Sequence, residues 1–279
     1  MPPTIILVHG AFAESASWDG IIEPLASAGH PVIAAANPLR GLAADAEAIS
    51  DVVRSVAGPV VLVGHSYGGS VISNVAADSG EITGLVYIAG FAPNPDESCF
   101  ELSAKFPGST LGDAVRPARR SDGTTDLTIA RDLFHEQFAA DVPATKTARM
   151  AVTQRPVALE ALQEPSGERP LWKELPSWFL YGDQDKNIPA ALQRFMAERA
   201  LARRAVEIAG ASHAIPVSHP ERTAHMVLEA AAGPHSSASA FAPADPMALD
   251  PLSPVAPAAD PMAVDPLGPI TTSQETSHV

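Results

Sequence analysis

Residues of the types that perform nucleophilic catalysis stand at three positions, Ser66, Asp185 and His213. Serine alone is a poor nucleophile, so it needs a base within hydrogen-bond reach, and that base must be oriented by a carboxylate. Histidine and aspartate serve these two purposes. The sequence therefore suggests a group in which His213 takes the proton of Ser66 while Asp185 holds the imidazole.

The sequence around Ser66 supports this interpretation. The apolar run 60–63 leads directly into Gly64-His65-Ser66-Tyr67-Gly68, and a helix-compatible stretch, 71–77, follows. This order predicts a buried strand, a sharp turn and a helix. In so tight a turn the central residue is strained, and a side chain at Gly64 or Gly68 would collide with the neighbouring turn. The hydroxyl of Ser66 would then stand clear of the turn.

The two partners are expected in loops that follow later strands. Asp185 comes after the apolar run 178–181, and His213 comes after the run 205–208. The carboxyl ends of parallel strands meet at one edge of a sheet, where a ligand crevice opens. Asp183 is the alternative acid, but a carboxylate so close to a turn often accepts hydrogen bonds from backbone donors. We therefore prefer Asp185.

An acyl-transfer site also needs backbone N–H groups that point at the developing negative charge. One donor would be Tyr67, directly after the nucleophile. The other would lie in the loop after the first strand, at Ala11, with Phe12 as the alternative. Gly10 lets that loop turn closely, and His9 is interpreted as a residue that organises the loop.

The elements that must hold these residues alternate along the chain. Apolar runs are followed by segments with helical periodicity, and the pattern is interrupted once. All-apolar strands joined by crossovers are typical of a parallel sheet that is covered on both faces. We expect strands at 4–8, 31–35, 60–63, 84–89, 177–181 and 205–208, with helices between them and a last helix at 220–231.

The interruption covers residues 93–170. Apolar and aromatic residues occur there among Pro, Gly and charged residues, with helical spacing at 127–138 and again at 150–162. This composition predicts an inserted, mainly helical cap. The flanking parts, 1–92 and 171–233, would form the core.

Composition changes abruptly after Gly233. Residues 234–279 contain no Lys or Arg, are rich in Pro, Ala, Ser and Asp, and carry a repeat, since 244–252 recurs as 259–267. Such proline density disfavours helix and central strand, so we expect a disordered tail. A solvated appendage without a site is the simpler interpretation, and a linear motif for a protein partner is the alternative that the repeat suggests.

Charge and cysteine content exclude several function classes. A net charge of −14 argues against nucleic acid or an anionic membrane as partner, because both require a basic face. The single cysteine, Cys99, excludes an internal disulfide and a cysteine-based zinc site. No basic, then apolar, opening segment and no bilayer-length apolar run is present, so we expect a cytoplasmic protein.

Four motifs in this order resemble the α/β-hydrolase superfamily. They are 9–12, 64–69, 181–185 and 211–213, and the resemblance covers residues 4 to about 231. It is strongest to the small lidded esterases grouped with plant methyl-ester esterases and hydroxynitrile lyases. That resemblance implies a doubly wound, mainly parallel six-stranded sheet with the second strand at the edge and the first beside the strand before Ser66. The cap would cover Ser66 and supply an apolar acyl or alcohol pocket, with Phe12, Tyr67 and the aromatic residues of the cap as candidate lining residues.

The expected function is hydrolysis of carboxylic esters of small, largely apolar substrates through an acyl-enzyme, without metal or organic cofactor. A ligand-binding protein that keeps the three residues is the alternative from another class. Hydroxynitrile lyases of the related branch carry a lysine after the catalytic histidine and a threonine after the first loop residue. Ala214 and Ala11 occupy those places here, which argues against lyase activity. Perhydrolysis by the same three residues is a further possible activity.

Overall fold

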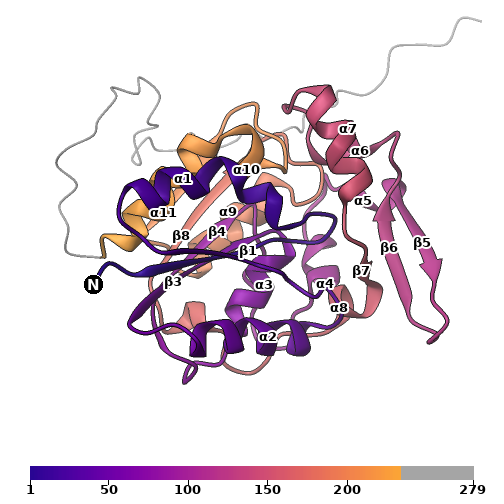
Figure 1. The fold of residues 1–279 in the computed structure, drawn as a ribbon. Coiled ribbons are helices and arrows are strands. Elements are labelled where there is room, and N and C mark those ends of the chain that lie inside the picture. The colour runs from indigo at the N-terminus through magenta and orange to yellow at the C-terminus, as the bar shows by residue number, and fades with distance from the viewer. Residues whose placement is uncertain (234–279) are drawn as a thin grey trace, which may run out of the picture. The chain divides into compact units, whose positions relative to one another are not determined.

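A six-stranded, entirely parallel sheet forms the centre of the computed structural model, which describes residues 1–233 (Figure 1). The strand order is β2-β1-β3-β4-β8-β9, so the predicted places of the first two strands and of the strand before Ser66 are confirmed. The strands are β1 (Thr4–Val8), β2 (Val32–Ala35), β3 (Pro59–His65), β4 (Glu81–Ile88), β8 (Ser177–Gly182) and β9 (Arg204–Ile208).

The strand β1 is almost entirely apolar because both faces of the sheet are covered. Successive side chains of a strand point to opposite faces. In β1, Ile5 and Leu7 therefore join one apolar cluster, while Ile6 and Val8 join the other. All four side chains are fully buried. This two-sided burial explains why the sequence of β1 shows no polar alternation.

Helices cover the two faces in two layers (Figure 1). On one face lie α1 (Asp19–Ser27), preceded by the 3-10 helix η1 (Ser15–Trp18), and α11 (Pro220–Ala231), preceded by α10 (Ile215–Ser218). On the other face lie α2 (Leu42–Arg54), α3 (Tyr67–Ser73) and α9 (Ala190–Arg199). α1 ends at Ser27, and Gly29 follows it with a positive φ of 91°, the left-handed conformation that commonly ends a helix.

The chain between β4 and β8 forms the inserted segment, which lies at one end of the sheet with β5 and β6 outermost (Figure 1). Its five short α-helices lie within the range expected for the helical cap, and one 3-10 helix follows them. It also contains a three-stranded antiparallel sheet, β5-β6-β7, which the sequence analysis did not predict. The elements are α4 (Cys99–Ser103), α5 (Leu111–Ala114), β5 (Val115–Arg119), β6 (Thr125–Ile129), α6 (Phe134–Phe138), α7 (Ala144–Thr153), β7 (Val157–Ala158), α8 (Leu159–Gln163) and the 3-10 helix η2 (Leu171–Lys173).

The helical interpretation of 127–138 is therefore wrong for its first part. Leu127 and Ile129 belong to β6 and are buried on alternate positions, as in a strand, while α6 begins only at Phe134. A turn at Asp122 and Gly123 joins β5 to β6, with Gly123 at a φ of 90°. An Asp-Gly pair of this kind is a hairpin signal that outweighs the apolar spacing. The expected helix at 150–162 is likewise divided by β7 into α7 and α8.

The expected tail, including the repeated segments 244–252 and 259–267, lies outside the described residues. Within residues 1–233, no helix combines the length and the apolarity that crossing a bilayer would require. The cytoplasmic compartment and a protein partner for the tail stay predictions.

Replacing Gly64 by alanine tests the contact on which the turn after β3 depends. An added Cβ would lie 2.5 Å from the carbonyl oxygen of Gly68. Because backbone cannot yield as a side chain does, we expect Gly64→Ala to lower the free energy of unfolding by about 3 kcal/mol or more. Urea denaturation measures the loss. Gly112→Ala is the control, since a Cβ there meets nothing within 4 Å, and equal losses in the two variants would contradict the account.

Candidate active site

Ser66 occupies the turn between β3 and α3 in a strained backbone conformation, with φ 54° and ψ −124°. Three backbone hydrogen bonds hold it there. Its N–H donates to the carbonyl of Ile88, and its carbonyl accepts from the N–H groups of Gly69 and Phe91. A positive φ at a residue with a side chain persists only where the surroundings over-determine it. The predicted strained turn is thus present.

Glycines bring the loop after β1 into contact with this turn. A Cβ on Gly68 would overlap the carbonyl oxygen of Val8, and one on Gly10 would lie 2.6 Å from the Cβ of Ser66 and 3.2 Å from its Oγ. The prediction that neither Gly64 nor Gly68 can carry a side chain is confirmed. At Gly68, however, the side chain would collide with β1 rather than with the turn itself. The backbone beside Gly10 therefore lies next to the serine hydroxyl.

Asp185 and His213 form a buried pair at the ends of two different strands. His213 Nδ1–H donates to Asp185 Oδ2 at 2.7 Å, and both side chains are almost inaccessible. The other carboxylate oxygen, Oδ1, accepts the N–H groups of Asn187 and Ile188 at 2.8 and 2.9 Å. With Nδ1 carrying the proton, the second ring nitrogen of His213 keeps its lone pair and can accept a proton.

Asp183, the alternative acid, lies elsewhere. Its side chain is exposed, and its Oδ1 accepts the N–H of Gly210 at 2.7 Å. This contact is the turn-satisfying role that the sequence analysis considered for it. Of the two candidate acids, only Asp185 contacts the histidine.

His65, which the sequence analysis did not single out, connects the turn of Ser66 with the loop of His213. Its Nε2–H donates to the backbone carbonyl of His213 at 3.0 Å, and the two rings lie 4.8 Å apart. Its Nδ1 is buried and has no hydrogen-bond partner within residues 1–233. Burial holds the pKa of His65 well below its usual range, so the ring is neutral. No local signal marks this role, because the partner lies 148 residues away.

An aromatic residue of the cap, Phe138, packs against the rings of both histidines. The ring of Phe138 lies edge-on to His213 at 5.0 Å and edge-on to His65 at 6.1 Å. Phe138 is almost fully buried, and Ser66 keeps only 7% of its surface exposed. The inserted segment therefore packs against the rings of both histidines.

The loop after β1 is held by a second neutral histidine. His9 Nδ1–H donates to the carbonyl of Gly10 at 3.0 Å, and its Nε2 accepts the N–H of Asn37 at 3.1 Å. The side-chain amide of Asn37 returns a hydrogen bond to the carbonyl of His9 at 2.9 Å. Burial lowers the pKa of His9 to about 4. These contacts agree with the expected loop-organising role of His9.

The predicted oxyanion donors lie on the two segments that flank Ser66. The N–H of Ala11 has no acceptor among the described residues, and Tyr67, as the first residue of α3, has no intrahelical acceptor for its N–H. Phe12 is buried and adopts a positive φ of 59°. Both N–H groups are therefore available to a ligand atom.

The side chain of Tyr67 does not line a pocket, contrary to the expectation. It is fully buried, and its hydroxyl donates to Asp45 Oδ2, at 2.8 Å, on α2. Asp45 also accepts the N–H of Arg40. Burial raises the pKa of Asp45. Tyr67 thus belongs to the core between α2 and α3, and only its backbone faces the serine.

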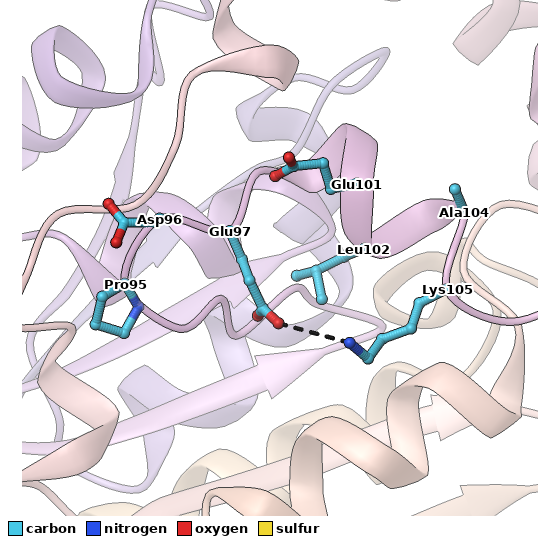
Figure 2. A pocket seen from close by; sticks show the side chains of 7 residues that line it. All are labelled: Pro95, Asp96, Glu97, Glu101, Leu102, Ala104 and Lys105. Atoms are coloured by element: carbon cyan, nitrogen blue, oxygen red, sulfur yellow. Dashed lines mark ion pairs between the residues drawn. The ribbon is translucent and has the colours of Figure 1, made fainter.

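A surface hollow beside α4 lies apart from this site. Figure 2 shows its lining, in which Glu97 and Lys105 form an ion pair with 3.9 Å between charged atoms. Glu97 is also paired with Arg199 at 2.7 Å. None of the predicted site residues lines the hollow. Its lining residues are Pro95, Asp96, Glu97, Glu101, Leu102, Ala104 and Lys105.

Comparisons with known proteins identify the family of the chain. Residues 5–226 match the model of the Alpha/beta hydrolase family, and the chain belongs to that family. This membership confirms the predicted superfamily and places the chain among hydrolases. A pyrethroid hydrolase of Sphingobium wenxiniae is 27% identical over 248 residues, which cover 82% of this chain and 88% of the relative.

Solved structures show the same fold. The crystal structure of polyneuridine aldehyde esterase has a TM-score of 0.71 at 20% identity, and the match covers 82% of this chain and 99% of the other. A pyrethroid hydrolase of Sphingobium faniae has a TM-score of 0.67 at 22% identity, with 83% and 98% covered. The predicted α/β-hydrolase fold is therefore confirmed.

Acidification tests the neutral state of His9. In the unfolded chain a histidine binds a proton below about pH 6.5, whereas the pKa in the folded protein is about 4. The stability that neutral His9 contributes is fully present when the pH lies above the pKa of the unfolded chain. It is lost as the pH falls toward the pKa of His9 in the folded protein. We expect a loss of about 2 kcal/mol by about pH 5.

The measurement is the free energy of unfolding of wild type and His9→Gln between about pH 7 and pH 5. The advantage of wild type should shrink as the pH falls. His225→Gln, at an exposed position of α11, controls for the loss of a histidine. A difference in the free energy of unfolding between wild type and His9→Gln that stays constant over this pH range would contradict a neutral His9 in the folded protein.

Proposed function

We propose that the chain is a serine esterase that cleaves carboxylic esters of small, largely apolar molecules through an acyl-enzyme. The observation that carries the proposal is the buried 2.7 Å contact between His213 Nδ1 and Asp185 Oδ2. His65 and Gly10 bring that pair and the loop after β1 to the strained turn of Ser66. A histidine held by a carboxylate near a serine can activate the serine hydroxyl as a nucleophile.

In the proposed first step, the Nε2 of His213 takes the proton of Ser66 as Oγ attacks the ester carbonyl carbon. Asp185 keeps the imidazole in the tautomer that can accept this proton and stabilises the imidazolium that results. The imidazolium then gives the proton to the leaving alcohol, so the acyl group remains on Ser66. Water repeats the sequence and releases the acid, which restores the free hydroxyl.

The N–H groups of Ala11 and Tyr67 would hold the negative oxygen of each tetrahedral intermediate. They project from the loop after β1 and from the start of α3, which flank the serine. Loss of one such donor typically costs about 3 kcal/mol of transition-state stabilisation. Neither step requires a metal or an organic cofactor.

The proposed substrate class follows from the surroundings of Ser66. Phe138 lies against His213, and Phe12 follows the proposed donor at Ala11, so an apolar acyl or alcohol group would find apolar partners. The net charge of −14 disfavours a highly anionic ester. The names of two similar proteins, a pyrethroid hydrolase and polyneuridine aldehyde esterase, support ester hydrolysis.

Steady-state hydrolysis of a p-nitrophenyl ester series, from acetyl to decanoyl, tests the proposal. Ser66→Ala should lower kcat/KM by about 10,000-fold or more, because it removes the nucleophile. Asp185→Asn should lower kcat by about 10,000-fold, because the imidazole loses its orienting carboxylate. Asp183→Asn is the matched control and should stay within about threefold of wild type, since surface changes of this kind have small effects.

Two outcomes would contradict the esterase. Hydrolysis that survives in Ser66→Ala would mean that another group performs it. Binding of small apolar ligands without multiple turnover would favour the ligand-binding alternative. A larger loss in Asp183→Asn than in Asp185→Asn would exchange the assignment of the acid.

A further inference from the structure

Gln137 lies on α6 of the cap, and all the hydrogen bonds of its side-chain amide go to residues outside that helix. Its Nε2 donates to the carbonyl of Lys186 at 2.9 Å and to Asn187 Oδ1 at 2.8 Å. Its Oε1 accepts the hydroxyl of Thr110 at 2.8 Å. Gln137 is buried, with 7% of its surface exposed. A buried amide without such partners would be costly, so these contacts fix the side chain in one place.

The segment that Gln137 holds is the one that orients Asp185. The N–H groups of Asn187 and Ile188 both donate to Asp185 Oδ1, which leaves Oδ2 for His213. Asn187 therefore takes part in two contacts at once, one through its side chain with the cap and one through its backbone with the carboxylate. Fixing Asn187 restricts the rotation of the Asp185 carboxyl group.

The Lys186 carbonyl accepts a second hydrogen bond from the cap. The backbone N–H of Thr110 donates to it at 3.0 Å, beside the amide of Gln137. Thr110 and Gln137 are also joined through their own side chains. Two cap segments thus meet on one backbone group that lies directly after Asp185.

The residues after Gln137 contact the loop of the histidine in the same way. Ser212, which precedes His213, donates its hydroxyl to Asp141 Oδ1 and lies 3.4 Å from the carbonyl of Phe138. The ring of Phe138 packs edge-on against His213 at 5.0 Å. The short stretch 137–141 therefore touches both the acid loop and the histidine loop.

We propose that Gln137 is a positioning residue of the reaction, which holds the loop of Asp185 so that the carboxylate stays aligned with His213. This inference rests on the proposed function, since it concerns the same site. Within residues 1–233, the side chain of Gln137 forms hydrogen bonds with neither Ser66 nor the proposed oxyanion donors, so it acts through Asn187 and Asp185. Small displacements of aligned groups lower rates strongly.

Gln137→Met tests the proposal, because methionine keeps the approximate volume and removes all three hydrogen bonds. The expected result is a kcat at least about tenfold lower, with KM within about threefold of wild type, since alignment in the transition state is lost while the pocket remains. The substrate is the best p-nitrophenyl ester of the series. A decrease confined to KM would overturn the positioning role.

Gln154→Met is the matched control. Gln154 also lies in the cap and also makes three side-chain hydrogen bonds, but its partners are Ile129 and Ala151 within the cap. Both variants should lose similar amounts of stability in urea denaturation, whereas only Gln137→Met should lose kcat. Equal losses of kcat in the two variants would mean that Gln137 only stabilises the cap, and this would overturn the proposal.

A double-mutant cycle shows whether Gln137 acts through Asp185. In the Asp185→Asn background, Gln137→Met should lower kcat by less than about twofold, because the carboxylate that it aligns is gone. A full additional tenfold loss would overturn the route through Asp185. If Gln137→Met does not fold, Gln137→Glu replaces it, since glutamate keeps the shape and the acceptor for Thr110 but removes both donors.

The controls separate this inference from the proposed function. If Ser66→Ala retains the hydrolysis of wild type, the esterase itself is wrong. If the hydrolysis depends on Ser66 and Asp185 while Gln137→Met behaves like Gln154→Met, only the role of Gln137 is wrong.

Discussion

The site depends on a contact between two backbones, in which the turn after β3 lies against the end of β1. Gly10, Gly64 and Gly68 all stand where a Cβ would meet neighbouring atoms at distances that real structures do not tolerate. This contact places the backbone beside Gly10 next to the hydroxyl of Ser66, and three backbone hydrogen bonds hold Ser66 at its positive φ. The two-sided apolar core supports it, because β1 and β3 are neighbours in register over their whole shared length.

Around this contact the structure buries two histidines and a carboxyl group. His9 and His65 are kept neutral by burial, and each uses its ring to fix a backbone carbonyl, that of Gly10 and that of His213. Asp185 is the buried carboxylate whose two oxygens are shared between backbone donors and an imidazole. Buried polar groups are tolerated where their hydrogen bonds are made, and here those bonds align the proposed catalytic side chains.

The sequence predicted the features that local patterns determine. The apolar run before Gly64, the glycine turn at Ser66 and the strands before Asp185 and His213 predicted a parallel sheet and the strand ends at which these residues stand. The places of the first two strands were implied by the resemblance to α/β-hydrolases. The β5-β6 hairpin was missed because Leu127 and Ile129 fit both a helical and an alternating pattern, and the turn signal of the preceding Asp-Gly pair decides between them. Contacts such as His65 with His213, or Gln137 with Asn187, join residues 148 and 50 positions apart, and no local pattern encodes them. The side chain of Tyr67 was misplaced for the same reason, since its partner Asp45 lies on another helix.

The central claim is that Ser66 is the nucleophile, and covalent trapping tests it most directly. Diethyl p-nitrophenyl phosphate is incubated with the wild-type protein, after which intact mass and peptide mass spectrometry locate the adduct. The account predicts one diethylphosphoryl group per chain, bonded to the Oγ of Ser66, with release of one p-nitrophenolate. A protein that remains unmodified, or an adduct on another serine such as Ser70 or Ser212, would contradict the account.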